Sequence, residues 1–221
     1  MKAIILAAGE GKRFGDITKT IPKPLIKLDE LSLIEHNILL LRKFGFNDLV
    51  INVSYLSNLI IEFLGSGSRY NVNINYSVEK PGPLETGGGI QNALKILGNE
   101  PFLVINSDIY TDCKLSDIKV NNNDLAALVM VKNPPHNTNG DFSLDNKRIT
   151  LSNKNTMTYS GIGIYKPEIF SKYKIKKYKL IDVLLEHIKN NKISGDEHKG
   201  IWYDVGDIKK LENFKRLFFN N

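Results

Sequence analysis

A glycine-rich segment that carries two basic residues lies near the start of the chain. It reads Leu6-Ala7-Ala8-Gly9-Glu10-Gly11-Lys12-Arg13-Phe14-Gly15 and is continuous with an apolar run. Small residues let a nucleotide approach the main chain, and free backbone amides hold phosphate oxygens. The glycine spacing fits neither the dinucleotide fingerprint nor the phosphate loop that ends in Gly-Lys-Ser/Thr. Taken alone, the segment is compatible both with a phosphate-binding loop and with a plain turn after a strand.

A lysine between two prolines, in Pro22-Lys23-Pro24, begins nine residues after Arg13. Proline restricts its own backbone and that of the residue before it, so the position of the Lys23 charge is stiffened. A fixed point charge suits a phosphoryl group in transfer, where catalysis is mostly positioning and charge stabilisation. A Lys-Pro pair alone would indicate only a surface turn, but the two motifs together favour chemistry at a phosphate.

Strands and helices alternate through the first half of the chain. Apolar runs predict strands at 2–8, 49–53, 72–77 and 102–105, with helical patterns at 32–45, 57–64 and 88–97. A capping box of Ser32 with Glu35 and a cap at Ser57 begin the first two helices, and glycines end the first and third. This alternation predicts a parallel sheet with helices on both faces. Because ligands bind at the carboxyl ends of such strands, the chemistry should gather after the first, third and fourth strands.

The second half is less regular. Strands are predicted at 125–131, 142–144, 148–151, 159–165 and 201–205, and helices at 180–189 and 208–218. Asp207 is predicted to cap the last helix. Because the sequence shows no repeat and no long Pro- or Gly-rich linker, we expect one domain over 1–221. The fold class is α/β, with a doubly wound, mostly parallel, Rossmann-like sheet in three layers, α/β/α.

The two motifs near the N-terminus resemble the signature of the sugar-1-phosphate nucleotidyltransferases. The resemblance continues through Leu84-Glu85-Thr86-Gly87-Gly88-Gly89-Ile90, Asn106-Ser107-Asp108, Asn139-Gly140-Asp141-Phe142, Tyr159-Ser160-Gly161-Ile162 and Gly200-Ile201-Trp202-Tyr203-Asp204-Val205-Gly206. It spans nearly the whole chain. It implies an enzyme with the nucleotidyltransferase fold that joins a nucleoside triphosphate to a sugar 1-phosphate and releases pyrophosphate.

The resemblance also implies roles for individual residues. By position, these are Ala8, Gly9, Gly11, Lys12 and Arg13 for the triphosphate, Lys23 for the reacting phosphate, Gly87 for the nucleobase, Asn106, Gly140, Asp141 and Ser160 for the sugar phosphate, and Asp108 and Asp204 for Mg²⁺. Arg13 and Lys23 are the expected catalytic residues, because they would neutralise charge on the transferring and leaving groups. Two carboxylates at strand ends also suit, on their own chemistry, a hard cation that bridges phosphates.

Within this family, the Leu-Glu-Thr-Gly-Gly-Gly run and the segment at 194–198 resemble the branch that transfers a uridylyl group from UTP to N-acetylmuramate α-1-phosphate in peptidoglycan recycling. The Glu-Lys-Pro segment that the hexose thymidylyltransferases use for the sugar does not occur in 148–155. Three alternatives stay open. These are a mannose or heptose phosphate guanylyltransferase, a nucleotide-sugar glycosyltransferase of similar topology, and a non-catalytic nucleotide-binding regulatory domain.

Composition narrows the class of partner. The net charge is +6, but 25 of the 30 basic residues are Lys and five are Arg, whereas Arg is the usual reader of bases and phosphates. The apolar runs are far shorter than the roughly 20 residues that cross a bilayer. The single cysteine, Cys113, allows no internal disulfide. We therefore expect a cytoplasmic monomer or small homo-oligomer that binds a nucleoside triphosphate and a sugar 1-phosphate, and neither nucleic acid nor membrane.

Overall fold

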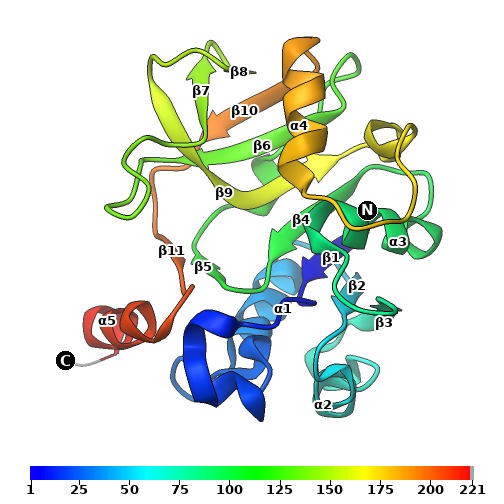
Figure 1. Ribbon diagram of the computed structural model, residues 1–221, viewed down its shortest axis with the longest axis vertical. Helices are drawn as coiled ribbons and strands as arrows, with labels where there is room; N and C mark the ends of the chain where they lie inside the picture. Colours follow the sequence, from blue (N-terminus) through cyan, green and yellow to red (C-terminus); the bar gives the residue numbers. More distant parts are fainter. Residues whose placement is uncertain (220–221) are drawn as a thin grey trace.

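The computed structural model describes residues 1–219, so the last two residues of the expected domain, 220 and 221, lie outside the described residues. The main sheet has the strand order β3-β2-β1-β4-β9-β6-β10-β8-β7, and a separate ribbon pairs β11 with β5 (Figure 1). The strands are β1 Ala3–Leu6, β2 Asp48–Val53, β3 Asn73–Val78, β4 Phe102–Asn106, β5 Ile109–Thr111, β6 Ala126–Val131, β7 Phe142–Asp145, β8 Arg148–Thr150, β9 Thr156–Tyr165, β10 Ile193–Glu197 and β11 Trp202–Asp204. The α-helices are α1 Leu33–Lys43, α2 Ser57–Leu64, α3 Glu85–Leu97, α4 Leu180–Lys189 and α5 Ile208–Phe218.

Four strands from the first half of the chain run parallel. On β1, Ile4 is in register with Val50 of β2 and with Val104 of β4. All three side chains are buried, as expected for parallel strands covered on both faces, and this burial explains the continuous apolar runs. The carboxyl ends of β1 to β4 therefore meet at one edge of the sheet.

The other half of the sheet is mixed. Strand β9 runs antiparallel to both β4 and β6, and β7 pairs with β8 as a hairpin, whereas β10 runs parallel to β6. The predicted α/β class is confirmed, with parallel pairing in β3-β2-β1-β4 and in β6-β10. Strand β10 is not predicted by the sequence, because Ile193-Ser-Gly-Asp-Glu contains a single large apolar residue.

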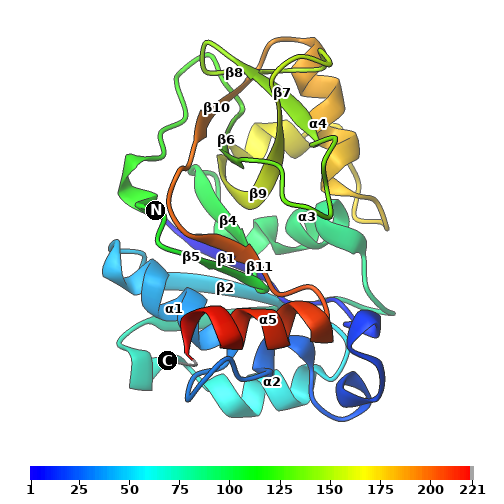
Figure 2. The same ribbon diagram turned by 90° about the vertical axis from the view of Figure 1, so that its left-hand side faces the viewer.

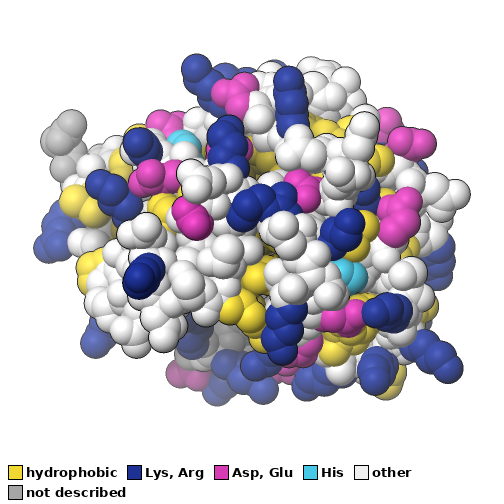
Figure 3. All heavy atoms as spheres, turned by 90° about the horizontal axis from the view of Figure 1, so that it is seen from above, with side chains coloured by type: hydrophobic (Ala, Val, Ile, Leu, Met, Phe, Trp, Pro, Cys, Tyr) yellow, Lys and Arg dark blue, Asp and Glu magenta, His cyan; other side chains and the backbone are white. Residues whose placement is uncertain are grey.

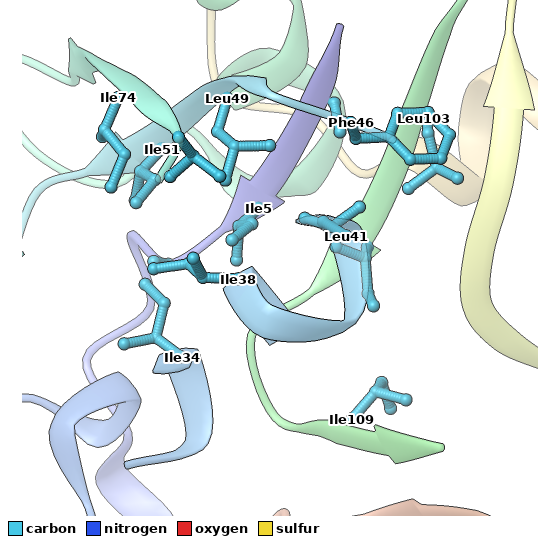
Figure 4. Close-up of a cluster of buried hydrophobic side chains, with 14 of the residues drawn as sticks. Ile5, Ile34, Ile38, Leu41, Phe46, Leu49, Ile51, Ile74, Leu103 and Ile109 are labelled. Carbon is cyan, nitrogen blue, oxygen red and sulfur yellow. The ribbon is translucent and has the colours of Figure 1, made fainter. Parts of the chain in front are cut away.

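Helices cover both faces of the sheet, which gives the expected three layers. Ile34, Ile38 and Leu41 of α1 belong to the same buried cluster as Ile5 and Leu103 of the strands (Figure 4). The opposite face is covered by α3 and α4. Their buried residues there include Ile90, Ala93, Leu97, Val183 and Leu184.

The helix starts test the capping predictions. Ser32 N donates to Glu35 Oε2 at 2.9 Å, so the predicted capping box is present at α1. Asp207 Oδ1 accepts from Lys210 N at 2.9 Å, as expected for the cap of α5. The prediction for α2 is wrong, because Leu56 is at the cap with φ 49° and no side-chain cap is formed. Ser57 is instead the first residue of the helix.

The β5–β11 ribbon connects the end of the chain to the centre of the molecule. Tyr203 of β11 pairs with Tyr110 of β5, and Phe214 of α5 packs against both rings at 5.4 and 4.8 Å between centroids. Figure 2 shows α5 lying alongside this ribbon. Val205 N donates to Asp108 O at 2.8 Å. The ribbon thus brings the segment around Asp204 next to the segment that follows β4.

Charged side chains of both signs are mixed on the surface. Figure 3 shows Lys and Arg side chains spread over one face of the molecule, with Asp and Glu side chains between them. In the part of the chain that the structure describes, every helix is too short or too polar to traverse a bilayer.

Candidate active site

A cavity of about 440 Å³ lies at the carboxyl ends of the parallel strands; we call it the first cavity. Its walls are the loop after β1, the ends of β2 and β4, the segment from β3 to α3, and Lys23. The lining residues are Leu6, Ala7, Ala8, Gly9, Glu10, Gly11, Lys12, Lys23, Pro24, Asn52, Glu79, Pro83, Glu85, Thr86, Asn106, Ser107, Asp108 and Lys177. This is the edge at which the sequence predicts a ligand site.

The glycine-rich loop is held close to Lys23. Gly11 has φ +68°, and a Cβ at this position would lie 2.9 Å from Lys23 Cβ and from Thr18 Cγ2. Only glycine fits this conformation and this approach without strain. Phe14 is fully buried and anchors the end of the loop. Ala8, Gly9, Gly11 and Lys12 all line the first cavity, so the structure brings these four predicted phosphate-binding residues together.

Lys23 is positioned by its two prolines. Pro22 and Pro24 are both buried, so the backbone on either side of Lys23 is fixed. Lys23 Nζ lies 2.5 Å from Asp108 Oδ2, and the two side chains are only 12% and 21% exposed. A catalytic candidate and a metal-ligand candidate therefore form an ion pair at the wall of the first cavity.

Asn52 and Glu79 connect the two halves of the cavity wall, and the sequence analysis misses both. Ala7 N donates to Asn52 Oδ1 at 2.7 Å, and Asn52 Nδ2 donates to Glu79 Oε1 at 2.6 Å. Leu84 N donates to Glu79 Oε2 at 2.7 Å. Burial raises the pKa of Glu79 above its ordinary value, and the hydrogen bonds from Leu84 and Asn52 act in the opposite direction. A signal for both residues exists in the sequence, because each is a polar residue at or just after the end of a predicted strand.

Three consecutive glycines at the start of α3 each allow a close approach. A Cβ at Gly87 would meet the Tyr178 ring, one at Gly88 would meet Lys176 O, and one at Gly89 would meet Glu79 Oε1. Gly87 N and Gly88 N both donate to Tyr178 O at 3.1 Å. Gly87 is thus buried under the segment before α4. It does not line the first cavity, whereas the neighbouring Glu85 and Thr86 do.

The predicted sugar-binding residues are divided between the end of β4, which carries Asn106, and the segments of β7 and β9, which carry Gly140, Asp141 and Ser160. Asn106 lines the first cavity and is packed against Gly161, where a Cβ would meet its amide group. Asp141 Oδ2 accepts from Tyr159 N at 2.8 Å. Ser160 is fully buried, and its Oγ accepts from Ile162 N at 3.2 Å. Gly140 has φ +67° and lies against Asn133. Gly140, Asp141 and Ser160 are outside the walls of the first cavity.

Asp204 lines a second cavity of about 560 Å³ between β11, α5 and the loop after β6. Its Oδ2 lies 2.6 Å from Lys210 Nζ, and its Oδ1 lies 3.3 Å from His136 Nε2. Arg13 is exposed and does not line the first cavity; its Nη1 would lie 3.0 Å from a Cβ at Gly206. Arg13 is therefore near the turn that follows Asp204.

The two predicted metal ligands lie on adjoining backbone, and each carboxylate faces an ammonium group. Lys23 and Lys210 supply positive charge at Asp108 and Asp204. Within residues 1–219, no group of three His, Cys, Asp or Glu side chains gathers around one point. Two carboxylates with further positions left to water and phosphate oxygens is the donor set that Mg²⁺ prefers. The residue types therefore fit this ion.

Comparison with known proteins identifies the family. The model of the family described as Nucleotidyl transferase matches residues 2–218. The chain belongs to this family. It is 42% identical to an N-acetylmuramate alpha-1-phosphate uridylyltransferase of Neisseria meningitidis serogroup B, over 98% of each chain. It is 29% identical to a D-glycero-alpha-D-manno-heptose 1-phosphate guanylyltransferase of Campylobacter jejuni, over the full length of both. The predicted enzyme class, a nucleotidyltransferase, is confirmed.

Solved structures support the fold. A Bacillus anthracis protein provisionally assigned as a glucose-1-phosphate thymidylyltransferase, solved with sucrose, superposes with a TM-score of 0.85 at 22% identity, covering 98% of this chain and 94% of that one. HddC from Yersinia pseudotuberculosis, complexed with GMP-PN, superposes with a TM-score of 0.79 at 21% identity, covering 98% and 99%. At these identities the likeness concerns the fold, and it confirms the predicted nucleotidyltransferase architecture.

Proposed function

We propose that this nucleotidyltransferase transfers the uridylyl group of UTP to N-acetylmuramate α-1-phosphate, giving the UDP-sugar and pyrophosphate in the recycling of peptidoglycan in the cytoplasm. The observation that carries the proposal is the 42% identity to the N. meningitidis uridylyltransferase over 98% of both chains. The Leu84–Ile90 and Asn139–Phe142 segments support it, because they resemble the same branch of the family.

The reaction needs a rigid, positively charged site that binds anions rather than a strong base. A phosphate oxygen of the sugar 1-phosphate attacks the α-phosphorus of UTP in line, a new P–O bond forms, and the bond to the bridging oxygen of pyrophosphate breaks. The attacking phosphate is already ionised at neutral pH, so the site has to position two anions and stabilise the charge that moves to the leaving group. Lys23, stiffened by its prolines at the cavity wall, is suited to that task.

The first cavity is the proposed nucleotide site. The backbone of Ala8 to Lys12 would hold the triphosphate, and the uracil would lie toward Glu85 and Thr86 on the opposite wall. Asn52 and Glu79 would hold the two walls at a fixed distance from each other through their hydrogen bonds. Arg13 would reach the phosphates from the Asp204 side.

Asp108 and Asp204 are the residues that would hold Mg²⁺. When bound, this ion would supply positive charge that offsets the negative charge of the reacting phosphates. Lys23 pairs with Asp108, and Lys210 pairs with Asp204. These ion pairs hold both carboxylates in place.

A pyrophosphate-release screen tests the proposal. The purified protein is assayed with each of four nucleoside triphosphates against N-acetylmuramate, N-acetylglucosamine, mannose and glucose 1-phosphates. We expect UTP with N-acetylmuramate α-1-phosphate to give the highest kcat/KM. A higher value for GTP with mannose 1-phosphate would replace this proposal with the guanylyltransferase function, which the 29% identity to the heptose enzyme supports. The absence of pyrophosphate release in every combination would favour a regulatory domain.

Arg13→Ala tests the proposed charge stabilisation, with Arg216→Ala as the matched control. Arg216 is exposed on α5 and donates to Asn213 Oδ1 at 2.8 Å. We expect Arg13→Ala to lower kcat by roughly 10²-fold or more, the size of losing one transition-state donor. Arg216→Ala should leave kcat within about twofold. An increase in KM alone for Arg13→Ala would mean that this residue binds nucleotide without acting on the transition state.

A further inference from the structure

We propose that the second cavity binds the carboxylate of an acidic sugar 1-phosphate, with Lys132 as the residue that pairs with it. This inference rests on the proposed function, because N-acetylmuramate differs from N-acetylglucosamine by a lactyl ether that ends in a carboxylate. It adds a binding residue and a reason for substrate choice.

The location of the second cavity is the first argument. The loop after β6 forms one wall with Val131 to His136 and then continues into the segment of Gly140 and Asp141. The opposite wall contains Asp204 and Trp202, and Trp202 Nε1 donates to Ser160 O at 2.9 Å. The second cavity therefore adjoins the proposed metal ligand Asp204 and the proposed sugar-binding segments.

The charges in this cavity are the second argument. Its lysine, histidine and aspartate lining residues are Lys132, His136, His198, Lys199, Asp204 and Lys210. Lys210 and His136 both contact Asp204, Lys199 Nζ lies 3.7 Å from Glu197 Oε2, and His198 Nε2 lies 3.0 Å from Asp112 Oδ1. Among the residues that the structure describes, Lys132 alone in this set has no acidic partner. The cavity thus presents one unmatched positive charge, which an anionic substituent would neutralise.

The backbone around Lys132 is fixed. Val131 pairs with Thr158 of β9, and Asn133 Nδ2 donates to Thr156 O at 3.0 Å. Asn133 Oδ1 also accepts from Thr158 Oγ1 at 3.0 Å. The Lys132 side chain itself is exposed, so its ammonium group reaches the second cavity from a fixed point on the backbone.

The shape of the cavity suits a substituted sugar. Val131, Pro134, Pro135 and the Trp202 ring give it apolar walls between the charged groups. A volume of about 560 Å³ is in the range of small-molecule sites, which are mostly apolar with a few placed polar groups. The methyl group of a lactyl ether would contact the apolar wall while its carboxylate meets Lys132.

The test compares two substrates that differ only in the lactyl ether. We would measure kcat/KM with UTP, and Kd by calorimetry, for N-acetylmuramate α-1-phosphate and N-acetylglucosamine α-1-phosphate. Lys132→Ala should lower kcat/KM and affinity for the first by about 10- to 100-fold, the effect of losing a hydrogen bond to a charged group. For N-acetylglucosamine α-1-phosphate, kcat/KM and Kd of Lys132→Ala should stay within about twofold of the wild type. Lys132→Arg should keep most of the preference for N-acetylmuramate α-1-phosphate. Lys132→Glu should weaken that preference further than Lys132→Ala does.

Lys119→Ala is the matched control, because Lys119 is an exposed lysine outside both cavities. This variant should leave kcat/KM and Kd unchanged for both sugar phosphates. Equal losses for both substrates in Lys132→Ala, or an unchanged ratio of their Kd values, would overturn the assignment of the carboxylate to Lys132. The proposed function is judged separately, by whether the wild-type protein with UTP turns over the acidic sugar phosphate faster than the other sugar phosphates. The variant ratios in the binding assay decide the role of Lys132 whichever sugar the wild type prefers.

Discussion

Replacing Asn52 with leucine tests whether the two walls of the first cavity are held together from inside. Asn52 is 2% exposed, and its amide group bridges Ala7 N of the phosphate loop and Glu79 Oε1 of the opposite wall. Leucine has nearly the same shape and makes neither hydrogen bond. The substitution therefore removes the bridge without opening a large cavity.

The expected loss follows from the two groups left without partners. Each buried polar group that loses its hydrogen bond costs about 1–3 kcal/mol. The Ala7 amide loses its side-chain partner, and the Glu79 carboxylate keeps only the bond from Leu84 N. Asn52→Leu should therefore lower the free energy of unfolding by about 2–5 kcal/mol, or Tm by about 5–15 °C for a chain of this length. Because Ala7 lines the first cavity, KM for the nucleotide should rise as well.

Denaturant unfolding and nucleotide titration measure both effects, with Asn92→Leu as the control. Asn92 is half-buried, and its Nδ2 donates to Ser77 Oγ at 3.0 Å and to Val78 O at 3.3 Å, away from the phosphate loop. The Asn92→Leu substitution should lower the free energy of unfolding by about 0.5–1.5 kcal/mol, the usual net value of such a hydrogen bond, and leave KM for the nucleotide unchanged. A loss in Asn52→Leu no larger than in Asn92→Leu, together with an unchanged KM, would refute the bridging role.

Four further predictions concern the site and its surroundings. Asp108→Asn should reduce turnover by on the order of 10²-fold or more, while Tm changes little. The control variant Asp112→Asn should stay active. Near-normal Mg²⁺-dependent rates in Asp108→Asn would remove Asp108 from the metal site. Lys23→Ala should lower kcat by roughly 10²-fold or more, and a change confined to KM would contradict its catalytic role. Because burial raises the pKa of Glu79, the folded protein binds this proton more tightly than the unfolded chain, so the contribution of Glu79 to stability falls as pH rises through the folded pKa. The free energy of unfolding, measured with denaturant between about pH 4 and pH 7, should show this fall in the wild type and not in Glu79→Gln. If the free energies of the two proteins changed in parallel with pH, Glu79 would not be the source of the fall. Burial also raises the pKa of Cys113 to about 11, so a thiol reagent at neutral pH should label it only after unfolding, and rapid labelling of the native protein would contradict its burial.

The regular part of the fold follows from local patterns. The strand after Lys2, the capping box of Ser32, and the predicted helices at 57–64, 180–189 and 208–218 agree with the observed elements, because their apolar periodicity matches the faces they bury. Strand β5 is missed, because Ile109-Tyr-Thr is too short to show a period and is stabilised by pairing with β11, almost 100 residues away in the sequence. Helix α3 begins at Glu85 rather than 88. Its early glycines have low helix propensity, but the packing of the segment before α4 overrides that preference.

The sequence predicts those site residues whose chemical type and neighbours alone indicate their role. The phosphate loop and Lys23 are recognisable because glycines and prolines constrain the backbone in a way that the sequence displays. Asn52 and Glu79 act through tertiary hydrogen bonds, and a single asparagine or glutamate gives no sign of its partner. The roles of Gly140, Asp141 and Ser160 stay predictions. The role of Gly87 at the nucleobase, which the family resemblance implies, also stays a prediction; the structure shows this glycine packed against Tyr178.

The β5–β11 ribbon also bears on the order in which the protein is completed during synthesis. All strands of the main sheet lie within residues 1–197, whereas Asp204 and α5 follow later in the chain. Because a nascent chain emerges N-terminus first and folds as it grows, the strands of the main sheet are all synthesised before the ribbon can close. A translation product cut short after Glu197 would lose Asp204, one of the two proposed metal ligands. It would also leave Phe14, at the end of the loop after β1, without Val205, Leu211 and Phe214, which share its buried cluster. The loop after β1 therefore reaches its final packing only when the last residues of the chain are in place.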